Sequence, residues 1–234
     1  WLQGAEFIRQ GPDLMLVGKD GSQVLLQDYF MQAESADLVT VNGGTFSAKL
    51  VARLAGPAAP GQVAQATPTG EQPIGTVDTI QGIVDAARAD GTKVKLAKGD
   101  PVFQGDVIET GAKGSIGLIL ADDSTFSVAE DGRVVLDEMV YDAEAQTGNL
   151  KVDLVQGVLS FVSGQIAKTD PDAMTLNTAL ATVGIRGTTG VLKLPAGEPV
   201  TIALAPNADG SIGELTVTND SGTQVLNQPF QGVQ

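Results

Sequence analysis

The stretch Leu150-Lys151-Val152-Asp153-Leu154 decides the fold of this chain, because its apolar and charged side chains alternate strictly. Successive side chains of a β-strand point to opposite faces of its sheet, so this order places the aliphatic side chains on one face and the charged ones on the other. An amphipathic helix would need apolar residues three and four positions apart. The stretch therefore predicts a half-buried strand.

The same alternation recurs along the chain beyond residue 74. It is found at Val94 and Leu96; Ile116, Leu118 and Leu120; Phe126 and Val128; Leu159 and Phe161; Met174 and Leu176; Leu192 and Leu194; and Leu215 and Val217. Gly-Asp or Asp-Gly pairs, which favour tight turns, occur about every ten residues between these runs. No stretch after residue 74 has an apolar stripe at helical spacing. The sequence therefore predicts an all-β fold.

Several all-β architectures fit this pattern: an antiparallel sandwich, a barrel and a β-solenoid. The apolar residues are mainly Val, Ile and Leu, and aromatic residues make up only 4% of the chain. Small aliphatic cores of this kind favour a β-roll or an irregular β-solenoid over a sandwich. A regular solenoid would require a constant repeat, and the sequence contains none.

A segment rich in Pro, Ala and Gly at 57–73 divides the chain. Such a composition predicts an extended linker. It separates a small β-rich prefix unit at 1–56 from a β domain at 74–194, which is followed by a C-terminal β-strand extension at 195–234.

The prefix unit shows its own local signals. Asp20-Gly21 between two apolar runs predicts a hairpin, since glycine adopts positive φ without a steric penalty. Ser47 is expected to cap a short helix that ends near Leu54. About 56 residues without a disulfide form only a marginal core, so this unit is expected to lean on another part of the protein.

Composition excludes most familiar chemistries. The chain has no Cys and no His, which removes thiol nucleophiles, disulfides, His-based triads and zinc sites built on thiolate or imidazole. Its net charge of -14 repels phosphate backbones and anionic lipid. No apolar run approaches the roughly 18 residues of a membrane-spanning helix. We therefore predict a non-enzymatic protein without a cofactor or metal site, which binds no nucleic acid and does not insert directly into a membrane.

Gly184-Ile-Arg186-Gly187-Thr188-Thr189-Gly190 is the segment most similar to a phosphate-binding loop. A Walker loop ends in Gly-Lys-Ser or Gly-Lys-Thr at the start of a helix, and neither the lysine nor a helical pattern follows here. We interpret the segment as a tight reversal in which Arg186 either donates hydrogen bonds to carbonyl groups or pairs with a carboxylate such as Asp153 or Asp172.

Acidic and basic clusters also have simpler interpretations. Asn207-Ala-Asp209-Gly210-Ser211 with Glu214, Asp170-Pro-Asp172 and Asp122-Asp123 lack the spacing of an EF-hand. We interpret them as turns in which Asp and Asn cap backbone amides, and a weak calcium site is left open. The adjacent acids Glu130-Asp131 and Asp137-Glu138 are interpreted as solvated face residues, and Lys93, Lys95 and Lys98 beside Arg88 as a charged outer face or edge strand.

The order of short motifs over roughly 74–194 resembles the FecR-type domain, which is named after the periplasmic ferric-citrate regulator. The residues that carry the resemblance are Gly99, Asp100, Gly105, Asp106, Thr110, Gly111, Gly157, Gly184, Arg186, Gly187 and Thr188. The family's usual Asp-Gly-Ser turn is here Asp122-Asp123-Ser124. The prefix unit resembles the front part of very large type I-secreted or surface adhesin-like bacterial proteins that carry FecR-like domains.

The resemblance implies an exported structural module for scaffolding, retention or self-assembly at the cell surface of a Gram-negative bacterium. Its expected partners are other copies of itself, or adjacent domains of a longer protein, which would add strands to exposed sheet edges. The alternative is a periplasmic FecR-type sensor that relays a receptor signal to a sigma factor.

Overall fold

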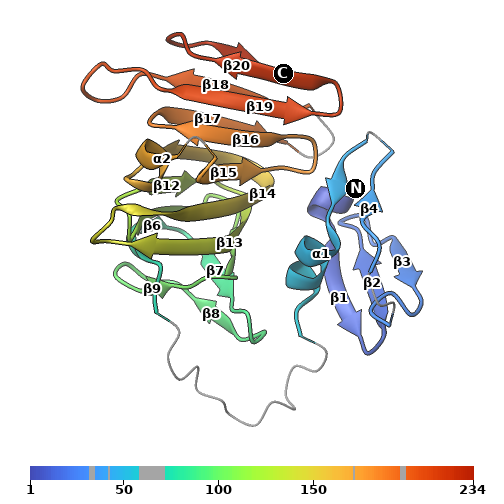
Figure 1. Cartoon of the computed structure of the whole chain (residues 1–234). Coiled ribbons are helices and arrows are strands. Elements are labelled where there is room, and N and C mark those ends of the chain that lie inside the picture. The colour runs from blue at the N-terminus through green and yellow to red at the C-terminus, as the bar shows by residue number, and fades with distance from the viewer. Residues whose placement is uncertain (32–34, 42, 58–71, 171, 196–198) are drawn as a thin grey trace.

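The computed structural model describes residues 1–31, 35–41, 43–57, 72–170, 172–195 and 199–234 (Figure 1). Strands account for nearly all of the regular structure, which confirms the all-β class. Most of the segment predicted to be a linker, 57–73, lies outside the described residues.

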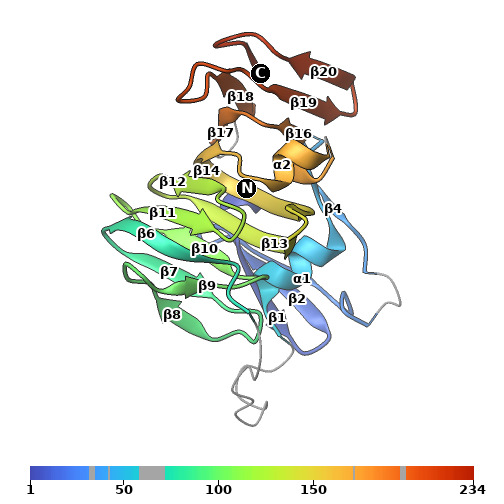
Figure 2. The same ribbon diagram turned by 60° about the vertical axis from the view of Figure 1, so that its left-hand side comes forward.

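Two sheets form the larger part of the structure, the body, and the long strand β14 (Thr147–Val162) belongs to both. The first part of β14 pairs with β13 (Arg133–Asp142) and with β15 (Met174–Asn177). Its last part pairs with β12 (Thr125–Val128) and with β17 (Thr189–Leu194). Figure 2 shows β14 between β12 and β13. A single strand therefore joins the two layers.

The remaining strands extend the two layers in both directions. One sheet has the order β9 (Pro101–Val102), β6 (Gly75–Gln81), β11 (Ser115–Leu120), β12, β14, β17, β18 (Thr201–Ala205) and β21 (Gly232–Val233). The other has the order β8 (Lys93–Lys95), β7 (Val84–Ala87), β10 (Val107–Thr110), β13, β14, β15, β16 (Thr182–Arg186), β19 (Glu214–Asn219) and β20 (Gly222–Leu226). The two sheets form an open double layer, and the described strands close no barrel.

The pair β14 and β15 is parallel, whereas the other strand pairs are antiparallel. A parallel pair requires a crossover connection rather than a hairpin. The short helix α2 (Ile166–Thr169) lies in that connection.

The main core lies between the two sheets. β11 illustrates the rule, since Ile116, Leu118 and Leu120 are buried while Ile119 is 39% exposed. Strands from the C-terminal part of the chain contribute Ile202 and Leu215, among others, to the same core. The alternation seen in the sequence therefore corresponds to an inner and an outer face.

The N-terminal unit has the elements expected of its sequence. It contains the 3-10 turn η1 (Leu2–Gly4), the sheet β1 (Glu6–Gln10), β2 (Asp13–Val17) and β3 (Gln23–Leu26), the pair β4 (Leu38–Val39) and β5 (Thr45–Phe46), and the helix α1 (Ala48–Ala55). The hairpin predicted at Asp20-Gly21 joins β2 and β3. The Ser47 hydroxyl accepts a hydrogen bond from the Leu50 amide at 3.3 Å, which confirms the predicted cap.

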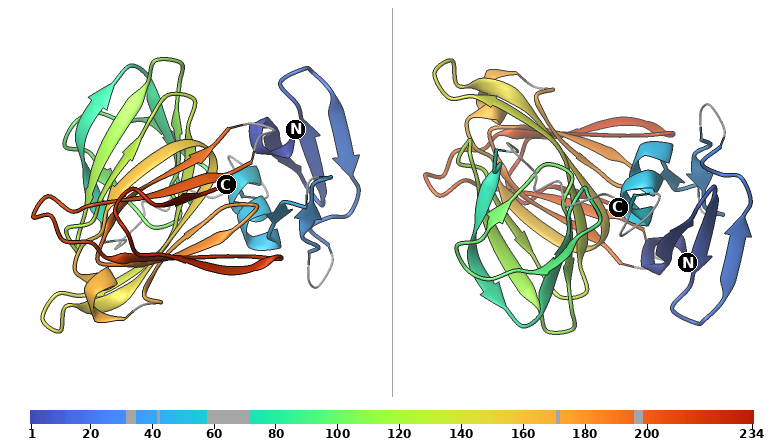
Figure 3. Two further views of the ribbon diagram at one scale, coloured as in Figure 1. Left: turned by 90° about the horizontal axis from the view of Figure 1, so that it is seen from above. Right: turned by 90° about the horizontal axis from the view of Figure 1, so that it is seen from below.

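The expectation that this unit leans on another part of the protein is also confirmed. Phe7, Phe46 and Val51 of the unit share one core with Val107, Val135 and Val155 of the body. Arg133 of the body donates a hydrogen bond to the Ala5 carbonyl at 2.9 Å. Figure 3 shows the unit beside the body with α1 on the facing side.

Two strands differ from the expectation. Apolar and polar residues do not alternate in β13, because both faces of this strand are buried. Val134 and Leu136 belong to the main core, and Val135 belongs to the core shared with the N-terminal unit. The runs at 150–154 and 159–161, expected as separate strands, belong to the single strand β14. Gly157, with a φ of 101°, lies between them and allows the strand to turn from one sheet to the other.

Candidate functional site

A buried ion pair fixes the Gly105-Asp106 turn. Asp106 is 1% exposed, and its Oδ2 contacts the guanidinium of Arg88 and accepts a hydrogen bond from the Phe103 amide at 2.8 Å. Arg88 also donates to the Pro101 carbonyl at 3.2 Å and lies over the ring of Phe103. Arg88 therefore holds an internal turn and does not belong to the predicted basic run, whereas Lys93 and Lys95 lie on the edge strand β8 as expected.

The neighbouring turn at Gly99-Asp100 is built in the same way. Asp100 Oδ2 accepts a hydrogen bond from the Ala97 amide at 2.8 Å, and the Gly99 amide donates to the Val77 carbonyl at 2.8 Å. Gly99 and Gly105 both have positive φ, at 88° and 86°. These two turns lie at the two ends of the short strand β9.

Thr110, Gly111 and Gly157 hold β10 and β14 against the loop that precedes β13. The buried Thr110 hydroxyl donates to the Ala129 carbonyl at 2.5 Å and accepts from the Gly132 amide at 2.8 Å. The Gly111 amide donates to the Ile83 carbonyl at 2.9 Å. A Cβ on Gly157 would lie 2.6 Å from the Cα of Gly132. The backbone of β14 therefore crosses this loop in direct contact.

The turn that departs from the FecR pattern is also well ordered by hydrogen bonds. Asp122 is fully buried, and its carboxylate accepts from the Ser124 amide at 3.1 Å and from the Ser124 hydroxyl at 2.8 Å. The Ser124 hydroxyl accepts in turn from the Gly164 amide at 2.9 Å. Asp123, at the usual glycine position, has a φ of 65°, which aspartate tolerates better than most residues.

Arg186 corrects one sequence-based prediction. Its guanidinium lies 3.4 Å from Glu214, its cross-strand neighbour on β19, and not beside Asp153 or Asp172. Register decides the pairing, because β16 is hydrogen-bonded to β19. Gly184 lies in β16, Gly187 has a φ of 56° in the turn that follows, and Thr188 is fully buried. The segment 184–190 therefore runs from β16 through a turn into β17, which agrees with its interpretation as a tight reversal.

Two acidic segments form the expected turns. Asp209 Oδ1 accepts from the Ser211 amide at 2.9 Å, and Asp170 Oδ1 accepts from the Asp172 amide at 3.0 Å. Among the described residues, no three acidic side chains converge as metal ligands.

The charged contacts that the sequence does not predict lie where α1 meets β13 and β14. Asp137, interpreted as a solvated residue, is 8% exposed and pairs with Lys49 of α1 at 2.7 Å. Glu138 pairs with Lys151 at 2.9 Å, and this hydrogen bond holds the pKa of Glu138 below its usual value. Burial raises the pKa of Asp153 to about 6, although Asn177 donates to its carboxylate at 3.0 Å. Their partners lie 13, 24 and 88 positions away along the chain, so the local sequence carries no signal for these contacts.

Replacing Asp153 with asparagine is expected to stabilise the protein at pH 8 and to leave it unchanged near pH 4. The raised pKa means that the folded state holds a proton that the unfolded state releases, so wild-type stability falls between about pH 4 and 6. The negative charge of Asp137 adds to this cost, while Lys49 and Lys151 reduce it. The difference at pH 8 should reach up to about 3 kcal/mol in urea unfolding.

Glu138→Gln is the matched control, because the pKa of Glu138 is shifted in the opposite direction. This variant should be slightly less stable than wild type at pH 7 and equal to it in acid. Parallel pH profiles for wild type and Asp153→Asn would contradict the role of Asp153.

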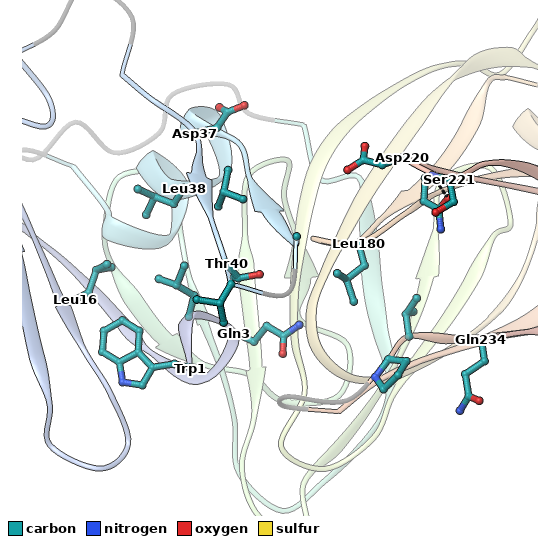
Figure 4. A pocket seen from close by; sticks show the side chains of 17 residues that line it. Trp1, Gln3, Leu16, Asp37, Leu38, Thr40, Leu180, Asp220, Ser221 and Gln234 are labelled. Atoms are coloured by element: carbon teal, nitrogen blue, oxygen red, sulfur yellow. Dashed lines mark hydrogen bonds between the residues drawn. The ribbon is translucent and has the colours of Figure 1, made fainter.

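A cavity of about 950 Å³ lies between the N-terminal unit and the C-terminal strands of the body (Figure 4). On the N-terminal side it is lined by η1 and the β4–β5 hairpin, and on the other by Leu180, Val200 and the turn between β19 and β20. Most of the side chains that line it are apolar. Sequence reasoning misses it because its lining residues come from segments far apart in the chain.

The comparisons with known proteins bear on residues in the middle of the chain. Residues 106–205, from Asp106 to the end of β18, match the family model described as FecR protein, so the chain contains a FecR domain. No curated protein matches the chain. A crystal structure of a candidate anti-sigma factor from Parabacteroides distasonis is similar at 10% identity and a TM-score of 0.34. The similarity covers 53% of this chain, and the chain spans about 60% of that protein. In the described part of the chain, no helix is long and apolar enough to cross a membrane.

The predicted function as a surface scaffold or self-assembly module is wrong. The match to the FecR family favours the alternative, a FecR-type regulator, and it gives no support to an adhesin-like context. The error has a physical reason. Acidic charge, an all-β fold and missing cysteines describe exported scaffolds and exported regulators equally well, so composition alone does not separate them.

Proposed function

We propose that this chain is the periplasmic part of a FecR-type regulator, which receives a signal from a receptor and relays it to a sigma factor. The observation that carries the proposal is the match of residues 106–205 to the FecR family. The matched segment contains the strands from β10 to β18, including β14, which joins the two sheets. The segment that supports the proposal is therefore the part of the body in which the two sheets are joined.

In this proposal the protein acts by binding and not by catalysis. Asp137 and Glu138, which could otherwise serve as acid catalysts, are paired with Lys49 and Lys151. A chain without cysteine also suits the oxidising periplasm, since it forms no incorrect disulfides there.

Transcription in the host tests the proposal. Deleting the gene should change transcription from the promoters of one alternative sigma factor, as measured by RNA sequencing. A full-length gene should restore the pattern, and a copy that lacks the codons for 106–205 should not. Val140→Lys supplies a matched control, because Val140 lies exposed on β13 and its replacement should not disturb folding. Unchanged transcription in the deletion strain would refute the regulator role.

Protease accessibility tests the location separately. Trypsin should cleave the protein in spheroplasts, in which the outer membrane is opened, and should not cleave it in intact cells. Cleavage in intact cells would place the chain on the cell surface and contradict the periplasmic location.

A further inference from the structure

The cavity between the N-terminal unit and the body has the size of a binding site. Its volume of about 950 Å³ falls in the range of ligand-binding cavities, about 300–1,000 Å³. Leu2, Leu38 and Val39 line one side, and Leu180 and Val200 line the other. A ligand bound in an apolar cavity of this size would bury more apolar surface than a ligand bound to isolated exposed side chains.

The β4–β5 hairpin exposes its aliphatic side chains at this cavity. Val39 is 66% exposed, and Val41, which also lines the cavity, is fully exposed. The two side chains lie on one hairpin and line the same cavity as Leu38 and Leu180, so apolar side chains gather at this place. Such patches on a folded protein mark interaction sites.

A strand edge is available at the same place. β4 and β5 pair with each other, and the Thr45 amide of β5 donates to the Ala179 carbonyl of the body at 2.6 Å. β5 is therefore hydrogen-bonded on both sides, whereas β4 has no second strand partner among the described residues. Leu38 and Val39 of β4 line the cavity. An extended peptide that adds to β4 would therefore place alternate side chains into the apolar space.

The charged side chains that line the cavity indicate which charge a bound segment should carry. Its two charged side chains are the carboxylates of Asp37 and Asp220, which lie on opposite sides at the same end of the opening (Figure 4). Neither takes part in the ion pairs of the described residues. The two carboxylates would attract a Lys or Arg side chain of a bound segment to this end of the opening.

We infer that this cavity binds an extended segment of another polypeptide, which adds to the edge of β4, fills the cavity with apolar side chains and places a Lys or Arg at Asp37 and Asp220. The inference goes beyond the proposed function and does not depend on it. It also gives the N-terminal unit a role, because this unit supplies β4 and half of the lining.

Trp1 provides an internal reporter for the test. It is the single tryptophan of the chain, lines the cavity and is 48% exposed. Its indole Nε1 donates to the Ser22 hydroxyl at 2.7 Å, which holds the ring in place. A bound segment should exclude water from this ring and shift its emission to shorter wavelength.

The probe is the acetylated, amidated peptide Lys-Val-Thr-Val-Thr-Val, titrated into the full chain. We expect a saturable blue shift of Trp1 emission with a dissociation constant of about 100 µM. A peptide with Glu in place of Lys should bind at least about tenfold more weakly, because of repulsion by the two carboxylates. A peptide with N-methyl groups at alternate residues should also lose about tenfold, because it cannot pair with β4.

Two variants test the location of the site. Val39→Lys should weaken binding of the Lys peptide about tenfold, since it places bulk and positive charge in the cavity. Val140→Lys, on the exposed face of β13 and outside the cavity lining, should bind as wild type. Asp220→Asn, in an exposed turn, should weaken binding about threefold and provides a test that needs no change in an apolar residue.

The inference is overturned by any of three results. These are the lack of a saturable shift up to about 1 mM peptide, equal binding of the Glu or the N-methylated peptide, and unchanged affinity in both Val39→Lys and Asp220→Asn. Circular dichroism and thermal melting verify that each variant is folded.

Discussion

Gly157→Ala is expected to lower the free energy of unfolding by about 4 kcal/mol. Gly157 has a φ of 101°, a conformation that residues with a Cβ rarely adopt. The added Cβ would also lie 2.6 Å from the Cα of Gly132. The unfavourable φ and the close approach to Gly132 both arise from main-chain positions, so no side-chain rotation relieves them. The backbone of β14 would have to move in both sheets. Chemical denaturation measures the loss.

Gly210→Ala separates the two contributions. Gly210 also has a positive φ, 80°, but nothing lies within 4 Å of the Cβ position. This variant should therefore lose only the backbone term, about 1 kcal/mol. Equal losses for the two variants would show that β14 does not cross the Gly132 loop in close contact.

Arg88→Met is expected to destabilise the protein by about 3–5 kcal/mol. The carboxylate of Asp106 is 1% exposed, and the guanidinium of Arg88 forms an ion pair with it. Removing the guanidinium takes an attractive charged contact away from a buried carboxylate, whose negative charge is costly in a medium of low dielectric constant. The same change removes the hydrogen bond to the Pro101 carbonyl and the stacking on Phe103. Urea unfolding at neutral pH measures the effect.

Two further variants test whether the buried charge causes the loss of stability in Arg88→Met. Arg88→Met combined with Asp106→Leu should recover part of the stability, because the buried negative charge is then removed as well. Lys98→Met removes an exposed pair with Asp78 at 3.8 Å and should cost less than about 0.5 kcal/mol. If Arg88→Met unfolds at the same urea concentration as Lys98→Met, the buried pair does not stabilise the turn.

The local features of the fold can be predicted from the sequence. The alternation at 150–154 and 116–120, the hairpin at Asp20-Gly21 and the cap at Ser47 all occur as expected. Each depends on residues a few positions apart, whose preferred backbone conformations hardly depend on the remainder of the chain. The FecR-like motifs can also be recognised from their order in the sequence, and the family match at 106–205 covers most of them.

The candidate site is less predictable, because its residues come from distant segments. Lys49 meets Asp137 across 88 positions, and Val39 faces Leu180 and Val200 across a cavity that neither segment forms alone. The same limit explains why the partner of Arg186 is Glu214 and not Asp153.

By itself, the sequence of this protein determined many of the strands, through their alternation of apolar and polar residues, the position of the Asp20-Gly21 hairpin and the helix cap at Ser47. Only the tertiary structure decided that β14 joins two sheets, that the N-terminal unit packs on Val107, Val135 and Val155, and that an apolar cavity opens between them. The reason is that strand propensity and turn geometry are short-range properties. Strand order and docking depend instead on which buried faces meet, and this is settled by packing over the whole chain.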